Sequence, residues 1–196
     1  MLYHRQEEMN LNTNQTIVIA GAGGIGFHLT KMLIMSGVND IHLYDFDTIE
    51  VHNLNRLDVP ISYVGKKKVD VLEQICKDLR PECNFNGYPF ECKEYMVPDK
   101  FDWFIDCTDK IDAQKTHFQI ANKKNVKYMK VGYDGYSISI NNRVASWGDG
   151  EDGYRVVPSF VAPAIIIAGL AVVKCLNPDY NHKEMSSYVG NLFRGN

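Results

Sequence analysis

The sequence GAGGIG, residues 21–26, decides the fold of this chain. It follows the apolar run IVIA, residues 17–20, and precedes a periodic segment that we expect to open as a helix near Ile25. A glycine-rich turn between a buried strand and a helix allows backbone N–H groups and the helix N-terminus to face an anion. Taken alone, the turn fits any dinucleotide-binding enzyme, or a turn that binds nothing. It therefore predicts a βαβ unit, and the residues that follow decide which ligand the unit serves.

Three polar motifs follow the glycine-rich turn: Asp45-Phe46-Asp47, Asn53-Leu54-Asn55-Arg56 and Gly65-Lys66-Lys67-Lys68. An aspartate just after the second expected strand would also suit an NAD site, where it would contact the ribose. An NAD site, however, has little use for an arginine and a lysine cluster just beyond that strand. A triphosphate needs such cations, because they offset its negative charge. The four motifs together predict a triphosphate nucleotide.

Composition excludes several classes of protein. The chain has 196 residues, 45% of them hydrophobic and 23% charged, which is ordinary for one globular domain with a sizeable core. A formal net charge of −3 argues against a general nucleic-acid binder. The five cysteines include no CxxC pair, so we expect neither a disulfide framework nor bound zinc. The N-terminal residues do not resemble a signal peptide, and the apolar stretch 160–173 is too short to cross a bilayer. We therefore expect a cytoplasmic protein that is not associated with membranes.

Strand and helix patterns alternate along the chain, which favours a parallel sheet covered by helices. The predicted fold is α/β and Rossmann-like, a doubly wound, mostly parallel sheet with helices on both faces. We expect an N-terminal arm (1–14), a single domain (15–177) and a polar C-terminal tail (178–196) that docks loosely or is disordered. The expected strands are 16–20, 41–45, 84–88, 103–107, 127–132 and 136–146, and the expected helices are 24–36, 67–79, 111–123 and 163–176.

The carboxyl ends of the expected strands carry the candidate site. In doubly wound sheets, ligands bind beyond these ends. Here they present residues 21–26, 45–47, the sequence Asp106-Cys107-Thr108-Asp109, and Gly132. The resulting surface is acidic and rich in glycine, which fits a nucleotide with its metal ion.

With these motifs the chain resembles the ThiF/MoeB/HesA family, the bacterial relatives of ubiquitin-activating enzymes. The match is carried by residues 21–26, 45–47, 53–56, 65–68 and 106–109, and is echoed by YHRQ at 3–6 and VAP at 161–163. The resemblance covers nearly the whole chain and implies that residues 15–177 form an ATP-binding adenylyltransferase. Such enzymes use ATP and Mg²⁺ to activate a carboxylate as an acyl-adenylate and release pyrophosphate. The usual substrate is the C-terminal glycine of a ubiquitin-like or sulfur-carrier protein, and a peptide C-terminus is another option.

The resemblance also implies a role for individual residues. Gly24 would lie against the nucleotide, and Asp45 would bond the ribose hydroxyls. The nucleotide-binding set is Gly21, Gly23, Gly24, Gly26, Asp45, Asp47, Asn53, Asn55, Arg56 and Lys68. Arg56, Lys68, Asp109 and Arg5 would act in catalysis, with Asp109 holding Mg²⁺. Arg5 would reach into the site of a neighbouring subunit, which implies a homodimer.

The chain departs from the family in several places. It lacks the two CxxC pairs that bind zinc in many members, and the loop 147–159 has no cysteine to accept sulfur or form a thioester. Leu57 stands where a polar residue is usual, and Lys110 where asparagine is usual. These departures leave a second interpretation open, a catalytically degenerate scaffold that binds nucleotide. A third, an NAD-dependent oxidoreductase, explains only the first two motifs.

Simpler explanations exist for several of the candidate residues. The lysines at 66–68 could start a solvated helix, although lysine is unfavourable there unless an anion is near. Arg56 could be a surface residue, and Asp106 and Asp109 could cap the helix that follows. Arg5 lies in a terminal arm, and such arms are often disordered. The histidines and cysteines show no ligand spacing and are interpreted as structural.

Overall fold

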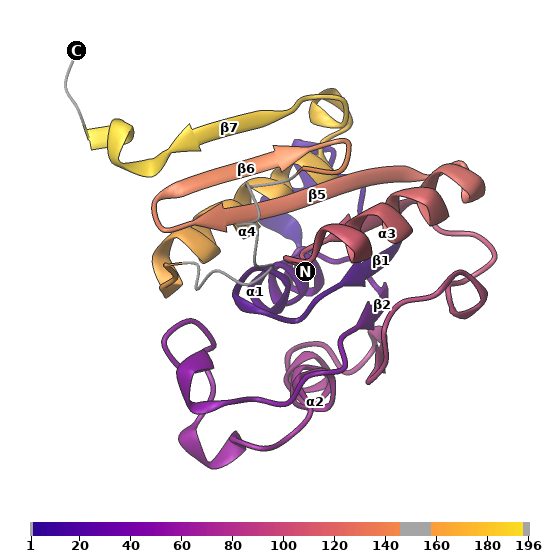
Figure 1. Cartoon of the computed structure of the whole chain (residues 1–196). Helices are drawn as coiled ribbons and strands as arrows, with labels where there is room; N and C mark the ends of the chain where they lie inside the picture. The colour runs from indigo at the N-terminus through magenta and orange to yellow at the C-terminus, as the bar shows by residue number, and fades with distance from the viewer. Residues whose placement is uncertain (1, 146–157, 194–196) are drawn as a thin grey trace.

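The computed structural model describes residues 2–145 and 158–193. Within them a seven-stranded sheet has the strand order β3-β2-β1-β4-β5-β6-β7. The first five strands along the chain pair in parallel, and β6 and β7 are antiparallel to their neighbours. The α/β, doubly wound, mostly parallel fold is therefore confirmed (Figure 1). The strands are β1 (Thr16–Ala20), β2 (Asp40–Tyr44), β3 (Asn84–Tyr88), β4 (Trp103–Asp106), β5 (Lys127–Asp134), β6 (Ser137–Asn141) and β7 (Met185–Tyr188).

Helices cover both faces of the sheet. They are α1 (Gly24–Met35), α2 (Lys68–Leu79), α3 (Ile111–Lys124) and α4 (Val161–Leu176). Alternate residues of β1 enter two separate cores: Ile17 and Ile19 pack with α1, α2 and α4, whereas Val18 and Ala20 pack with α3 and the segment 92–101. Figure 1 shows α3 and α4 on opposite sides of the sheet. Burial of both faces explains why the central strands are continuously apolar.

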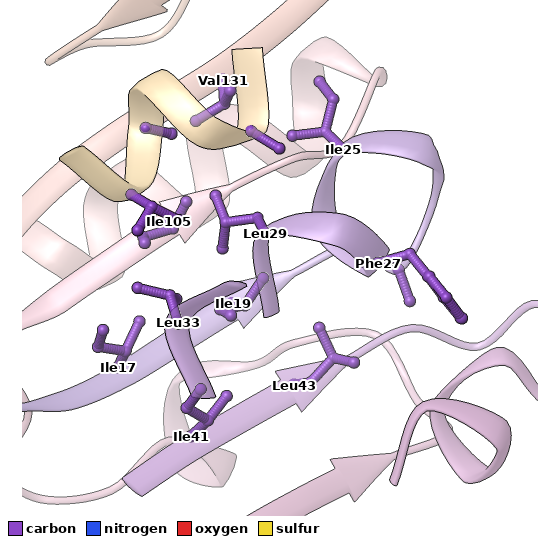
Figure 2. Packing of buried hydrophobic residues seen from close by; sticks show 14 of the residues in the cluster. Ile17, Ile19, Ile25, Phe27, Leu29, Leu33, Ile41, Leu43, Ile105 and Val131 are labelled. Atoms are coloured by element: carbon purple, nitrogen blue, oxygen red, sulfur yellow. The ribbon is translucent and has the colours of Figure 1, made fainter. Parts of the chain in front are cut away.

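The first core holds α1 against the sheet (Figure 2). Leu29 and Leu33 on α1 lie over β1 and β2, and both side chains are fully buried. At about 25 cal/mol per Å² of buried apolar surface, each such leucine contributes about 2 kcal/mol. This packing fixes the start of α1 relative to the end of β1, which is where the glycine-rich turn lies.

Some boundaries differ from the expectations. The strand expected at 136–146 ends at Asn141, and the helix expected from 163 begins at Val161, so that Pro163 falls in its first turn, where proline is tolerated. The segment 178–196, expected as a loosely docked tail, contributes β7, which pairs with β6. The loop 147–159 lies outside the described residues except for its last two. No helix in the described ranges has both the length and the apolarity needed to cross a membrane.

The N-terminal arm docks against the domain as a short 3₁₀ helix (His4–Met9). Gln6 Nε2 donates to Ser36 O at 2.8 Å, and Arg80 Nε donates to the Tyr3 hydroxyl at 3.1 Å. Ser36 and Arg80 follow the C-terminal ends of α1 and α2. The arm therefore lies at the end of the sheet where the parallel strands begin, opposite their carboxyl ends. The 12 residues of α1 separate it from the glycine-rich turn by about 18 Å.

Candidate functional site

The site lies where the strand order changes direction. β1 is flanked by β2 on one side and β4 on the other, so the connections that leave them diverge and open a crevice beyond their carboxyl ends. The glycine-rich turn leaves β1 at Gly21, Asp45 follows β2, and residues 106–109 end β4. Three of the predicted motifs are thus brought together at one edge.

The glycine-rich turn needs glycine at two positions for its own geometry. Gly21 has φ +94°, in the left-handed region that favours glycine, and its N–H donates to Tyr44 O at 2.8 Å. A Cβ at Gly26 would lie 1.8 Å from Gly21 O, so α1 could not approach the turn with any other residue there. Gly23 differs, because nothing lies within 4 Å of where its Cβ would be. The turn therefore leaves open space in front of Gly23, at the N-terminus of α1.

Asp45 holds this turn in place. One carboxylate oxygen accepts from the Ala22 N–H at 2.6 Å, and the other accepts from the Asp47 N–H at 2.8 Å. Each oxygen keeps a second lone pair, which leaves capacity for the hydroxyls of a ribose. Next to Asp45, Phe46 and the segment 89–96 line an open depression of about 420 Å³.

Arg56 reaches the start of α1 from the loop after β2. A Cβ at Gly24 would lie 3.0 Å from Arg56 Cδ, so the arginine stem packs directly on that glycine. Arg56 Nη1 donates to His52 O at 2.9 Å and to Asn55 Oδ1 at 3.0 Å, and His28 Nε2 lies 2.9 Å from Arg56 O. Both the guanidinium and the backbone carbonyl of Arg56 are therefore held by hydrogen bonds, and the side chain does not extend freely into solvent.

The two asparagines of the same loop both make hydrogen bonds within the chain, one local and one to the segment before α4. Asn53 is buried, and its Oδ1 accepts from the Glu50 N–H at 3.0 Å, which closes the turn. Asn55 Nδ2 donates to Ser159 O at 2.8 Å. The departure at Leu57 has a packing reason, because this side chain is 3% exposed in the core beneath the loop.

The three lysines at 66–68 have three different partners. Lys68 is buried at the start of α2, and its ammonium lies 2.7 Å from an Asp47 carboxylate oxygen. Lys67 donates to Phe46 O at 2.5 Å, and Lys66 lies over the Tyr63 ring. Of the three lysines, only Lys68 pairs with a carboxylate, that of Asp47. A lysine at the start of a helix is unfavourable unless an anion is near, and for Lys68 that anion is Asp47.

Asp109 and Asp106 have separate environments at the end of β4. The N-cap of α3 is Lys110 and no side chain caps this helix, so the capping explanation for Asp109 does not hold. Asp109 is exposed, and no hydrogen bond or ion pair from the described residues engages its carboxylate. Asp106 is fully buried, and its Oδ1 accepts from the Thr108 N–H at 2.9 Å and the Thr108 hydroxyl at 2.6 Å.

Asp106 also belongs to a buried polar cluster that the sequence did not reveal. Its Oδ2 lies 2.8 Å from His117 Nδ1 and accepts from the Tyr128 hydroxyl at 3.0 Å, and Lys130 is its register partner on β5. Burial alone would raise the pKa of Asp106, but the bond to His117 and the nearby Lys130 charge hold this pKa below its ordinary value. Burial lowers the pKa of Lys130, and Asp106 opposes that shift. The cluster ties α3, β4 and β5 together behind Asp109.

Tyr133 and Ser159 also border the site, although sequence reasoning did not select them. Tyr133 Oη lies 3.2 Å from where a Cβ of Gly24 would be. Neither residue belongs to a motif, so only the folded chain brings them together. Arg5 is the one predicted site residue that lies elsewhere, in the arm at the opposite end of the sheet.

The residues present fit a nucleotide with one divalent ion. The open space at Gly23 and the α1 N-terminus suit a phosphate. Arg56 packs on the adjoining Gly24, and Lys68 carries positive charge beside Asp47, which follows β2 at the same end of the sheet. Mg²⁺ is usually held by one or two carboxylates together with substrate phosphates, so Asp109 alone is a sufficient protein ligand. The described residues contain no group of three or more His, Cys, Asp or Glu side chains arranged to hold a metal by themselves.

Comparison with known proteins places these features in one family. The E. coli protein MccB, crystallised with AMPCPP and MccA, superposes with a TM-score of 0.74 at 20% identity, over 90% of this chain and 64% of MccB. Ubiquitin-like modifier-activating enzyme 5 of Caenorhabditis elegans is 23% identical over 90% of this chain and 50% of its own length. The tRNA threonylcarbamoyladenosine dehydratase of Bacillus subtilis is 33% identical over 54% of this chain and 44% of its own length.

The chain spans about half the length of these curated relatives. The family model described as "ThiF family" matches residues 4–179, which is most of the sequence. The match includes every residue of the glycine-rich turn, the arginine and lysine motifs and the end of β4. This chain belongs to the ThiF family.

Proposed function

We propose that this chain binds ATP with Mg²⁺ and transfers the adenylyl group to a carboxylate, giving an acyl-adenylate and pyrophosphate. One observation carries the proposal: Arg56 packs on Gly24, Lys68 lies beside Asp47 just after β2, and the exposed Asp109 follows β4, so side chains from three separate segments lie at the same end of the sheet as the glycine-rich turn. An NAD site would use the turn and Asp45 but would leave these three side chains without a purpose.

The chemistry accounts for the residue types. A carboxylate oxygen attacks the α-phosphorus of ATP, the new P–O bond forms, and the bond to the β,γ-pyrophosphate breaks. The attacking group is already ionised, so the chain needs neither a nucleophile nor a general base. It needs cations, because two anions approach each other and charge develops on the leaving pyrophosphate. Arg56 and Lys68 would supply that charge, and Mg²⁺ held by Asp109 would neutralise the phosphates and align them for in-line attack.

Asp45 and the depression beside it would hold the nucleoside. Its carboxylate is already fixed by the Ala22 and Asp47 N–H groups, so its remaining lone pairs have a defined direction. Lys68 pairs with Asp47 at 2.7 Å, and we propose that the phosphates of a bound nucleotide compete with Asp47 for this ammonium. The half-exposed position of Asp47 makes such an exchange inexpensive.

The names of the relatives support a proposal for the substrate class. One is named as an enzyme that activates a ubiquitin-like modifier, another as an adenylyltransferase and sulfurtransferase, and MccB was crystallised with MccA. We propose a protein or peptide whose C-terminal carboxylate, ending in glycine for a ubiquitin-like partner, enters the site. Zinc is not part of this proposal, since the chain has no CxxC pair.

Exchange of labelled pyrophosphate into ATP tests the proposal. The purified protein is mixed with MgATP and candidate partners, including ubiquitin-like proteins and short peptides that end in glycine. Exchange that depends on one partner and is lost in Asp109→Ala supports adenylation. Binding of MgATP without pyrophosphate exchange in the presence of any candidate partner would instead indicate a nucleotide-binding scaffold. Pyrophosphate exchange at the wild-type rate in Asp109→Ala would refute the assigned role of that residue.

A further inference from the structure

Tyr133 reaches the start of α1 from β5, which lies on the side of β1 away from β2. It lies near the end of β5, which is separated from β2 by β1 and β4, about 14 Å at the usual spacing between strands. Its hydroxyl nevertheless lies 3.2 Å from where a Cβ of Gly24 would be, and Arg56 Cδ lies 3.0 Å from the same point. Tyr133 and Arg56 therefore meet over Gly24, the first residue of α1.

The surroundings hold the Tyr133 hydroxyl in this position. Ser159 lies beside the phenol, where its side chain opposes the rise in the Tyr133 pKa, and Ser159 O accepts from Asn55 Nδ2 at 2.8 Å. Pro158 O accepts from the Gly135 N–H at 2.7 Å, so the residues before α4 are fastened to both sides of the site. Burial raises the pKa of Tyr133, so the phenol keeps its proton at neutral pH and can donate a hydrogen bond.

The position of Tyr133 relative to Asp45 suggests what it contacts. Asp45 marks the ribose end at the carboxyl end of β2, and the α1 N-terminus marks a phosphate. A ligand that runs from β2 across the end of β1 reaches Tyr133 only with its portion beyond that phosphate, on the β4 and β5 side. In-line attack places the incoming carboxylate opposite the leaving pyrophosphate. Lys68, proposed above to offset the charge of the pyrophosphate, lies beside Asp47 on the β2 side, so the carboxylate belongs on the β5 side, where Tyr133 lies.

We propose that Tyr133, positioned beside Ser159, forms the acyl subsite, in which the Tyr133 hydroxyl donates a hydrogen bond to an oxygen of the bound carboxylate and then of the acyl-adenylate. This inference rests on the proposed adenylation and adds a binding residue to it. The phenol is neutral, so it orients the carboxylate without the strong attraction that a second arginine would exert and that would oppose release of the product.

The test uses a stable mimic of a glycyl-adenylate, 5′-O-(N-glycylsulfamoyl)adenosine, because this probe requires no knowledge of the partner protein. Calorimetry measures the affinity of the mimic, of AMP and of MgATP for the wild-type chain, Tyr133→Phe and Ser159→Ala. We expect Tyr133→Phe to bind the mimic about tenfold more weakly, since one hydrogen bond to a polar ligand is lost, and to bind MgATP within about twofold of wild type. Ser159→Ala removes a partner of Tyr133 but leaves the phenol, so its loss should be smaller.

If Tyr133→Phe weakens the binding of MgATP as much as that of the mimic, the phenol contacts the phosphates and the acyl subsite is refuted. If wild type binds MgATP and the mimic but Tyr133→Phe binds the mimic equally well, the acyl subsite is refuted while the proposed function stands. If Ser159→Ala loses as much affinity as Tyr133→Phe, Tyr133 acts by bracing the segment before α4, and direct contact is refuted. A wild-type chain that binds MgATP but prefers AMP to the mimic also overturns the subsite. Failure to bind MgATP overturns the proposed function itself.

Discussion

Gly23 and Gly26 belong to one turn but differ in what surrounds them, and this difference predicts opposite effects of alanine. At Gly26 a methyl group would overlap the carbonyl oxygen of Gly21, 1.8 Å away, so the turn and α1 must separate. We expect Gly26→Ala to lower the free energy of unfolding by 3 kcal/mol or more, on the order of other strongly overpacked sites. Chemical denaturation with measurement of the midpoint and slope checks this.

Gly23→Ala provides the matched comparison. Its φ of −76° suits alanine, and the space around it is open, so stability should change by less than about 1 kcal/mol. If a phosphate occupies that space, the methyl group should weaken MgATP binding at least tenfold, as measured by calorimetry. Unchanged affinity in a folded Gly23→Ala protein would show that the nucleotide does not lie against this turn.

Lys68 and Lys66 form a second pair at the scale of single residues. Lys68 lies beside Asp47, whereas Lys66 lies over the Tyr63 ring. Loss of one phosphate-directed cation should cost about 3–4 kcal/mol of transition-state stabilisation, a fall of 10²–10³-fold in pyrophosphate exchange for Lys68→Ala. Lys66→Ala should keep nearly full activity. Equal losses in the two variants would indicate a general charge effect rather than a specific contact.

At the scale of elements, the cluster around Asp106 joins β4 to α3 and β5. Asp106→Asn would remove the buried carboxylate oxygen that contacts His117 and Tyr128, and because a hydrogen bond to a charged group is worth about 1.5–3 kcal/mol, the loss of two should cost about 3–5 kcal/mol. Asp112→Asn is the control, because that aspartate lies on α3 with its side chain 90% exposed. Thermal or chemical unfolding should separate the two variants clearly, and similar stabilities would show that the Asp106 charge is not needed.

The same cluster predicts a dependence of stability on pH. The pKa of Asp106 is lower in the folded chain than its ordinary value of 3.8, so its charge stabilises the fold above that pH. This contribution should decline as the pH falls below about 4 and disappear below the folded pKa. Unfolding measured between pH 6 and 2 should show the decline in wild type and less of it in Asp106→Asn. Parallel curves for the two proteins would contradict the lowered pKa.

How far the elements could be predicted depends on the kind of signal each one carries. The central strand Trp103–Asp106 and the helix Lys68–Leu79 were placed to within one residue, because burial on two faces and a regular helical period leave a clear pattern. β7, Met185-Ser-Ser-Tyr, has no such pattern, since an edge strand need not be apolar and β6 supplies its pairing. The motifs indicated Gly23, Arg56, Lys68 and Asp109, but the contact of Tyr133 with Gly24 depends on how β5 lies against α1, which no local pattern records.

At the scale of the whole molecule, the arm that carries Arg5 raises the question of a dimer. Tyr3 and Gln6 fasten this arm to the edge opposite the site, so Arg5 lies too far from the nucleotide-binding turn of its own chain. We propose that Arg5 completes the site of a second subunit, where an arginine beside a triphosphate in a water-poor crevice is strongly stabilising. Light scattering should then show a homodimer.

Mixing two inactive variants tests this proposal. After subunit exchange between Arg5→Ala and Lys68→Ala, each mixed dimer contains one site with both residues intact if Arg5 acts across the interface. Pyrophosphate exchange should then return in part. Full activity of Arg5→Ala alone, or a protein that remains monomeric at all concentrations, would contradict a role for Arg5 between subunits.

The central claim is that the crevice beyond β1, β2 and β4 binds a triphosphate nucleotide and not a dinucleotide, and a calorimetric titration tests it most directly. Wild type, Lys68→Ala and Lys66→Ala are each titrated with ATP in the presence of Mg²⁺, with ATP alone and with NAD⁺. We predict binding of MgATP by wild type and Lys66→Ala, weaker binding of ATP without the metal, a marked loss in Lys68→Ala and no binding of NAD⁺. Tight binding of NAD⁺, or MgATP affinity that is the same in all three proteins, would contradict the claim.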